Sequence, residues 1–168
     1  PIAFAPSTPK PLSYDPVKDL AHIALLGTIP LALVVRTELT AKNVREVVVL
    51  AREKRGALNF SSSGNATPSH FMLERFKLSA GVDIAHVPYK GAGPALQDLI
   101  AGQVDVMFDG LGSSAQHIKA GTIRPLAVAA AKRSAALPDV PTTAQAGLKG
   151  YEVSTWYGLW APAGTPRD

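Results

Sequence analysis

The 168-residue sequence contains no cysteine, which excludes disulfide bonds, thiol nucleophiles and zinc sites with cysteine ligands. It also lacks a long uninterrupted apolar run. The longest apolar stretch, from Ile23 to Val35, is broken by Gly27 and Pro30 and is too short to span a bilayer. The start of the chain shows no signal-peptide pattern of a basic segment, an apolar segment and a small-residue cleavage site.

What is present is an ordinary globular composition with a mild positive charge. Hydrophobic residues make up 46% of the chain and charged residues 18%, which suits one compact domain with a core. The net charge is +4, but the basic residues are scattered, and the densest basic run, 52–55, contains Glu53. We therefore expect no nucleic-acid partner, whereas a mild positive bias suits an anionic small ligand.

Strand-like and helix-like segments alternate along the chain. The first sixteen residues are rich in proline and are expected to form an extended lead-in. Apolar runs predict strands at 23–28, 31–35, 58–61, 84–87, 104–108, 126–131 and 151–161. Apolar periodicity and capping residues predict helices over 43–54, from Pro68 after the N-cap Thr67 to Gly81, from Pro94 to Gly102, from Ser113 or Ser114 to Ile118, and over 142–146. The alternation predicts an α/β fold with a mostly parallel sheet flanked by helices on both faces.

Three loops between a predicted strand and the following helix share one chemical character. They span 61–68, 88–94 and 109–114, and they are rich in glycine and in hydroxyl side chains. In open α/β sheets, loops at the carboxyl ends of the strands line the ligand crevice. Backbone N–H groups at helix N-termini, glycines and hydroxyls at that place favour an anionic ligand. The alternative is that these residues only form turns and helix caps.

Catalytic and metal-binding patterns are weaker. Ser63, His70 and Asp109 supply the residue types of a hydrolase triad, but no G-x-S-x-G motif is present. A small serine hydrolase that uses these three residues is kept as one alternative. The four histidines lie in separate elements without a paired metal-ligand spacing, so we expect no metal site. Lys90 can pair with a ligand carboxylate or point into solvent, and Asp109 can cap a turn or accept from a ligand amine.

Seven short motifs occur in a recognisable order. They are Tyr14–Asp19, Ser62–Gly64 with His70, His86–Gly91, Gly102–Asp109, Ile118–Gly121, Leu137–Thr142 and Ala161–Pro166. From about Tyr14 onward the chain resembles the Bug (TctC-like) receptors of tripartite tricarboxylate transporters. The joint occurrence of all seven motifs makes this resemblance specific.

The resemblance implies a periplasmic-binding-protein type II (Venus flytrap) fold and a receptor that is not an enzyme and needs no cofactor. Such receptors hold a small carboxylate between two lobes in the periplasm and deliver it to membrane permease subunits. The implied ligands are di- and tricarboxylates, acidic amino acids and aromatic acids. The candidate ligand-binding residues, all in the loops singled out above, are Ser62, Ser63, Gly64, Asn65, Thr67, Tyr89, Lys90, Gly91 and Asp109.

The family pattern also implies that this chain is a fragment of a two-lobed protein. Family members begin with a strand and a Pro/Gly-rich loop of the first lobe, which have no counterpart here. We expect residues 1–24 to be a remnant of the first lobe and lead-in, 25–162 the second ligand-binding lobe with hinge strands at 25–35 and 153–162, and 163–168 the start of the return to the first lobe. Hinge strands without their lobe leave exposed edges and apolar surface, so we expect dimerisation or strand swapping. A further alternative is the effector-binding domain of a transcription regulator, which would need a helix-turn-helix segment upstream of Pro1.

Overall fold

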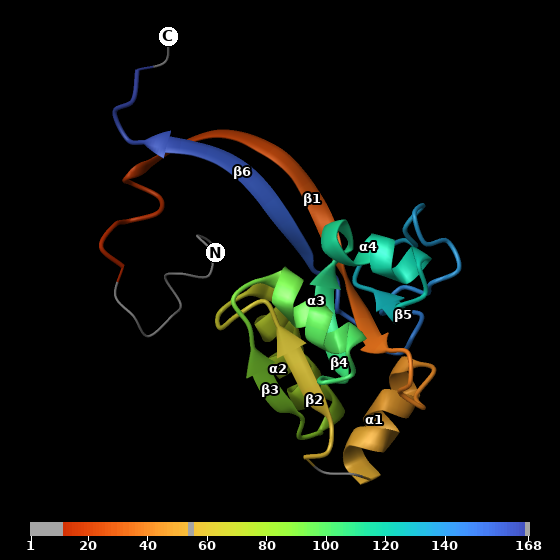
Figure 1. The fold of residues 1–168 in the computed structure, drawn as a ribbon. Coiled ribbons are helices and arrows are strands. Elements are labelled where there is room, and N and C mark those ends of the chain that lie inside the picture. Colours follow the sequence, from red (N-terminus) through yellow and green to blue (C-terminus); the bar gives the residue numbers. More distant parts are fainter. Residues whose placement is uncertain (1–11, 54–55, 167–168) are drawn as a thin grey trace.

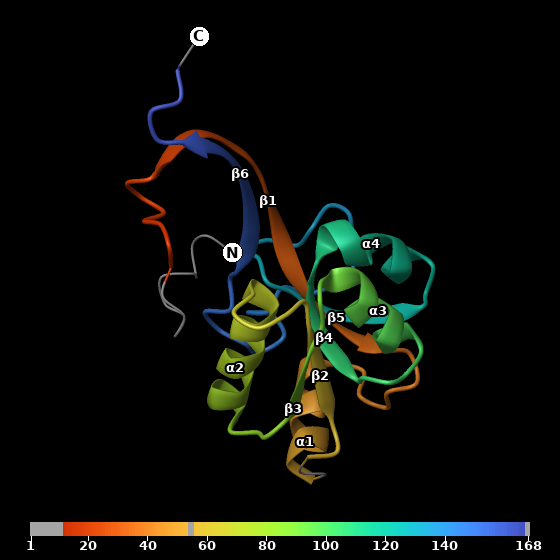
Figure 2. The same cartoon turned by 60° about the vertical axis from the view of Figure 1, so that its left-hand side comes forward.

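The computed structural model describes residues 12–53 and 56–166, and these form an α/β lobe with a long two-stranded projection (Figures 1 and 2). The strands are β1 (Leu20–Arg36), β2 (Asn59–Ser62), β3 (Ala85–Pro88), β4 (Val106–Gly110), β5 (Ile123–Val128) and β6 (Ser154–Pro162). The helices are α1 (Val44–Glu53), α2 (Pro68–Ala80), α3 (Ala92–Ile100) and α4 (Leu111–Lys119). The predicted α/β class is confirmed.

The sheet is mixed, with strand order β3-β2-β4-β1-β5, and β6 pairs with β1. β2 pairs in parallel with β3 and β4, whereas β1 is antiparallel to both β4 and β5. Four strands of this path therefore point the same way and β1 points the other way. The predicted parallel arrangement holds for β2, β3 and β4, and the central β1 is the exception because it enters the sheet from the projection.

β1 is one strand of 17 residues, where the sequence predicted two runs separated near Pro30. The strand continues through Pro30 because its pairing partner changes there. Residues 20–30 pair with β6, whereas residues 31–36 pair with β4 and β5. Proline lacks a backbone N–H, and a position where the ladder changes partner tolerates that loss.

Helices cover both faces of the sheet, and side chains that alternate along β1 divide the core into two clusters. Leu31, Leu33 and Val35 face the cluster that contains the apolar side chains of α1 and α2. Ala32 and Val34 face the other cluster, which contains those of α3 and of Leu111 at the start of α4. All five of these β1 residues are at most 2% exposed, so this half of β1 is the centre of the lobe.

Helix α2 agrees with the sequence prediction at both ends. Thr67 is the N-cap, and its hydroxyl accepts from the backbone N–H of His70, with Pro68 in the first turn. Gly81 ends the helix in the left-handed conformation. These signals are local, and no distant contact is needed to place them.

Helix α1 also agrees with its prediction over 43–54, and Asn43 Oδ1 accepts from Glu46 N at 3.0 Å as an N-cap does. The three remaining helix predictions need correction. Helix α4 begins at Leu111, so neither Ser113 nor Ser114 is its cap. The Ser114 hydroxyl donates to the carbonyl of Gly110, and the Ser113 hydroxyl makes its shorter bond, 2.6 Å, to Asp109 Oδ2. Helix α3 begins at Ala92, before the predicted start at Pro94. The helix predicted over 142–146 is wrong, because this segment forms turns whose backbone bonds to β5, including Thr143 N to the Val128 carbonyl at 2.8 Å.

The projection is an antiparallel ribbon made of the first half of β1 and of β6, and both figures show it extending away from the packed lobe (Figures 1 and 2). Residues 21–28 are exposed. The large apolar side chains exposed on the ribbon are Ile23, Leu25, Leu26, Trp156, Tyr157 and Leu159. None of the described helices is long and apolar enough to cross a membrane. The predicted division into 1–24, 25–162 and 163–168 stays a prediction.

Candidate ligand-binding site

Three loops meet at one edge of the sheet, where β2, β3 and β4 end. Because these strands are parallel, their carboxyl ends share an edge, and in Figure 1 their arrowheads point toward the side from which the ribbon projects. They are 62–67, from the end of β2 to α2; 88–91, from the end of β3 to α3; and 109–110, the last two residues of β4, which α4 follows directly. The loop predicted over 109–114 is therefore the end of β4 and the first turn of α4. All nine predicted ligand-binding residues therefore lie at this edge, which is named the crevice edge below.

Two helices begin at the crevice edge with a glycine at the N-cap. Gly91 precedes α3 with φ 118°, and Gly110 precedes α4. Within the described chain, no side chain forms a capping hydrogen bond at either helix start, whereas α2 is capped by Thr67. The first N–H groups of a helix have no partner inside the helix and carry the positive end of its dipole. The two uncapped starts therefore offer donors suited to an anion.

The first two loops are tied together by backbone contacts. Tyr89 N donates to the Ser62 carbonyl at 3.0 Å, and Gly91 N donates to the Ser63 carbonyl at 3.1 Å. Gly64 lies against the second of these loops: a Cβ at this position would be 3.1 Å from the Tyr89 carbonyl oxygen. Its φ is 131°, a conformation that favours glycine. A small change in either loop is therefore transmitted to the other.

Asp109 is a buried carboxylate at the end of β4, only 4% exposed. Ser113 Oγ donates to its Oδ2 at 2.6 Å. Burial raises the pKa of the Asp109 carboxyl above its ordinary value, and the bonds from Ser113 and the Gly110 backbone oppose this rise. A charged group held in this way at a helix start can accept a hydrogen from a bound molecule.

The remaining candidates differ in what they present. The Tyr89 hydroxyl donates to Asp98 Oδ2 at 2.6 Å, so it points toward α3. Burial, together with Asp98, raises the pKa of the Tyr89 phenol to about 12. Asn65 and Lys90 are exposed, which leaves both free to rotate. The ligand contacts of all nine candidate residues stay predictions.

A histidine pair beside the first loop was not anticipated from the sequence. The rings of His70 and His86 stack with centroids 4.1 Å apart and planes 9° apart. His86 Nε2 lies 2.7 Å from Ser62 Oγ, and His70 Nδ1 accepts from Ala66 N at 3.2 Å. Burial and the neighbouring His70 lower the pKa of His86. The pair could not be found from spacing, because only the pairing of β2 with β3 brings His86 beside Ser62 and α2.

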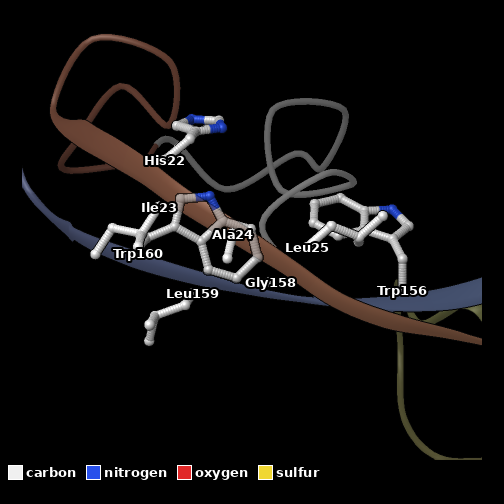
Figure 3. Close-up of a pocket in the computed structure, with 8 residues that line it drawn as sticks. All are labelled: His22, Ile23, Ala24, Leu25, Trp156, Gly158, Leu159 and Trp160. Carbon is white, nitrogen blue, oxygen red and sulfur yellow. The ribbon is translucent and has the colours of Figure 1, made fainter.

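A second concavity lies on the ribbon and is apolar (Figure 3). It has a volume of about 260 Å³ and is lined by residues of β1 and β6, among them Trp156 and Trp160. The two indole rings lie 5.5 Å apart, and the Trp160 ring covers Gly158, where a Cβ would lie 2.5 Å from the ring. This groove contains none of the predicted ligand residues and shares no lining residue with the crevice edge.

The whole chain, residues 1–168, matches the family model described as the tripartite tricarboxylate transporter family receptor, TctC. The chain belongs to this family. It is 41% identical over 166 residues to a curated relative, the UPF0065 protein in the tcbD-tcbE intergenic region of Pseudomonas sp. (strain P51). That alignment covers 98% of this chain and 48% of the relative, so the chain spans about half the length of the curated relative.

Two solved structures are similar to this chain in both sequence and fold. R. palustris Rpa4515 with adipate is 38% identical with a TM-score of 0.90, and the match covers 94% of this chain and 53% of that one. MatC (Rpa3494) from Rhodopseudomonas palustris with bound malate is 34% identical with a TM-score of 0.88, over 98% of this chain and 55% of that one. The predicted TctC-like resemblance is confirmed.

TctC-family proteins are binding receptors, and the hydrolase alternative is wrong. Two of its three residues have other side-chain partners: His70 Nδ1 accepts from Ala66 N, and Asp109 Oδ2 accepts from Ser113 Oγ. Among the residues that the structure describes, no group of three or more His, Cys, Asp or Glu could hold a metal ion.

Proposed function

We propose that this TctC-family chain is the lobe of a periplasmic solute receptor that grips a small carboxylate at the crevice edge and presents it to membrane permease subunits. The observation that carries the proposal is the meeting of two uncapped helix starts and three strand-end loops at one edge of the sheet. Family membership and the relatives solved with adipate and malate support a carboxylate as the ligand class.

Each group at the crevice edge is proposed to make a different contact with the ligand. The backbone donors at the starts of α3 and α4, with the hydroxyl of Ser63, bind a carboxylate of the ligand. The Thr67 hydroxyl donates to the Gly64 carbonyl at 2.7 Å and holds the loop. The exposed Lys90 adds a mobile positive charge at the rim. Asp109 accepts from a hydroxyl or amine of the ligand and so distinguishes ligands that carry such a donor from those that do not.

A thermal-shift screen tests the proposal. Adipate, malate, succinate, citrate, glutamate, nicotinate and benzoate are compared with the corresponding uncharged amides. At least one acid is expected to raise the melting temperature with increasing concentration, because a ligand that binds only the folded state stabilises it. The matched amide is expected to have no effect. Equal shifts from the acid and its amide would contradict recognition of an anion.

Self-association is the expected behaviour of the chain when it is studied by itself. The ribbon exposes 68% of Leu26 and 65% of Leu25, and such apolar surface favours association in water. Light scattering after size-exclusion chromatography is expected to show a dimer or larger species. The double variant Leu25→Lys with Leu26→Lys is expected to shift the distribution toward the monomer. A wild-type chain that remains monomeric at high concentration would contradict this expectation.

A further inference from the structure

Ala66 holds an unfavourable backbone conformation inside the first crevice loop. Its φ is 57°, and among the described residues it is the one non-glycine residue with a positive φ. Residues that carry a Cβ rarely adopt this backbone conformation. Residues in such conformations persist only where their surroundings hold them, and they gather at functional sites. The group that holds Ala66 is a side chain, because its N–H donates to His70 Nδ1 at 3.2 Å.

His70 occupies a position that usually serves a helix cap. It is the third residue of α2 after the N-cap Thr67, where glutamine or glutamate reaches back to a backbone N–H in a capping box. Here His70 Nδ1 accepts from the N–H of Ala66, the residue before the N-cap, instead of from the N–H of the N-cap itself. Only a nitrogen without a proton can accept this bond, so the geometry assigns the hydrogen of a neutral His70 to Nε2.

The opposite side of the ring is held by His86. The stacked rings are 4.1 Å apart, and His86 Nε2 lies 2.7 Å from Ser62 Oγ, which also accepts from Gly64 N at 3.2 Å. The contacts therefore run from Ser62 through His86 and His70 to Ala66, and both ends are in the same crevice loop.

Resting on the proposed function, we propose that His70 and His86 are positioning residues that hold the 62–67 loop in its binding conformation only while both rings are neutral. Carboxylate affinity then falls when the solution is acidified. A proton on His70 Nδ1 removes the acceptor for Ala66 N, and a second charge on the stacked ring would repel the first.

The charged groups near the pair are Glu74 and Lys77 of α2, and Asp83, which comes shortly after α2 in the sequence. Glu74 Oε1 lies 3.8 Å from His70 Nε2, and the Glu74 charge acts to raise the pKa of His86. Lys77 partly offsets this, because its Nζ lies 3.5 Å from Glu74 and 3.9 Å from Asp83. Burial lowers the pKa of His86 from 6.5, so His86 favours its neutral form, and the stability this gives is lost as the pH falls below that value.

The first test is the state of the imidazoles in the full chain, by long-range ¹H–¹⁵N correlation NMR. At pH 8 we expect His70 to carry its proton on Nε2. On acidification, the amide signal of Ala66 is expected to move with the same midpoint as the His70 ring. A proton on His70 Nδ1 at pH 8, or an Ala66 signal that ignores the His70 titration, would overturn the inference without touching the proposed function.

The second test is the affinity for adipate and malate between pH 8 and pH 5.5, by calorimetry. We expect a loss of roughly three- to tenfold, the effect of one hydrogen bond. His70→Gln keeps an acceptor at all these pH values, so it is expected to bind more tightly than His70→Leu. It is also expected to lose less affinity on acidification than the wild type, because only His86 can still gain a proton. Adding Ala66→Gly to His70→Leu is expected to restore affinity, because glycine tolerates the positive φ.

The control is His22→Gln, which changes a histidine on the ribbon and is expected to keep the wild-type profile. Tighter binding on acidification would overturn the inference. It would show that attraction between the charged histidines and the anion outweighs any loss of affinity from the changed loop conformation. Binding without pH dependence would also overturn it and leave the proposed function intact. No binding of any tested carboxylate at any pH would overturn the proposed function and, with it, the predicted effect on affinity.

Discussion

Replacement of Gly64 by valine is expected to weaken carboxylate binding by about tenfold or more. The backbone at Gly64 has φ 131°, and a Cβ there would lie 3.1 Å from the Tyr89 carbonyl oxygen. A side chain must therefore push the 62–67 loop away from the 88–91 loop. The loss of one hydrogen bond to a charged ligand group, about 1.5–3 kcal/mol, corresponds to at least tenfold in affinity.

The matched control for Gly64→Val is Gly121→Val. Gly121 also has a positive φ, 71°, and open space around its Cβ position, and it lies after α4, away from the crevice edge. Each variant is expected to lose on the order of 1–3 kcal/mol of unfolding free energy from backbone strain. Only Gly64→Val is expected to lose affinity for malate or adipate in calorimetry. Equal affinities for the two variants would remove the 62–67 loop from the binding site.

Asp109→Asn is expected to change stability and binding in opposite directions. Burial raises the pKa of Asp109, so its ionised form opposes folding at neutral pH, and the associated stability is present at low pH and lost as the pH rises through the raised pKa. The uncharged asparagine removes this cost and still accepts from Ser113. Urea unfolding at pH 7 is therefore expected to show a more stable variant, with a smaller advantage at pH 5.

The same substitution is expected to weaken malate binding more than adipate binding. Malate carries a hydroxyl that can donate to the Asp109 carboxylate, whereas adipate has no such donor. The expected loss for malate is about tenfold, from a hydrogen bond to a charged group. Calorimetry with the two acids gives the ratio directly.

Asp105→Asn is the matched control for Asp109→Asn. Asp105 is also buried, at 7% exposed, but its Oδ1 accepts from Arg36 Nε at 2.7 Å. Removing the negative charge of Asp105 therefore leaves the partly buried Arg36 cation without an anionic partner. This variant is expected to be destabilised at pH 7. If Asp109→Asn were destabilised in the same way and bound malate like the wild type, Asp109 would be a structural residue only.

The parts of the fold that were predictable from the sequence are those with local causes. Helix α2 was placed correctly because Thr67, Pro68 and Gly81 act on their own neighbours. The start of α3 was missed because Gly91 is held by a bond from its N–H to the distant Ser63 carbonyl. The turns at 142–146 were predicted as a helix, since no local signal showed that Thr143 would bond to β5.

The same distinction between local and distant causes applies to the crevice loops and the histidine pair. The meeting of the crevice loops could be predicted because parallel strands bring their carboxyl ends to one edge, whereas the binding of an anion there stays a prediction. The histidine pair could not be predicted, since His70 and His86 meet only when β3 lies beside β2 and α2 packs over both. The strained Ala66 is likewise a property of the folded loop, and nothing about an alanine in the sequence indicates it.

The most direct test of the central claim is a ¹⁵N-labelled sample of the chain titrated with malate and with adipate, with the amide signals followed by NMR. We expect the largest shifts in 62–67, 89–92 and 109–113, and little change in the ribbon residues 21–28 and 154–161. Shifts confined to the ribbon groove around Trp156 and Trp160, with none at the crevice edge, would contradict the account.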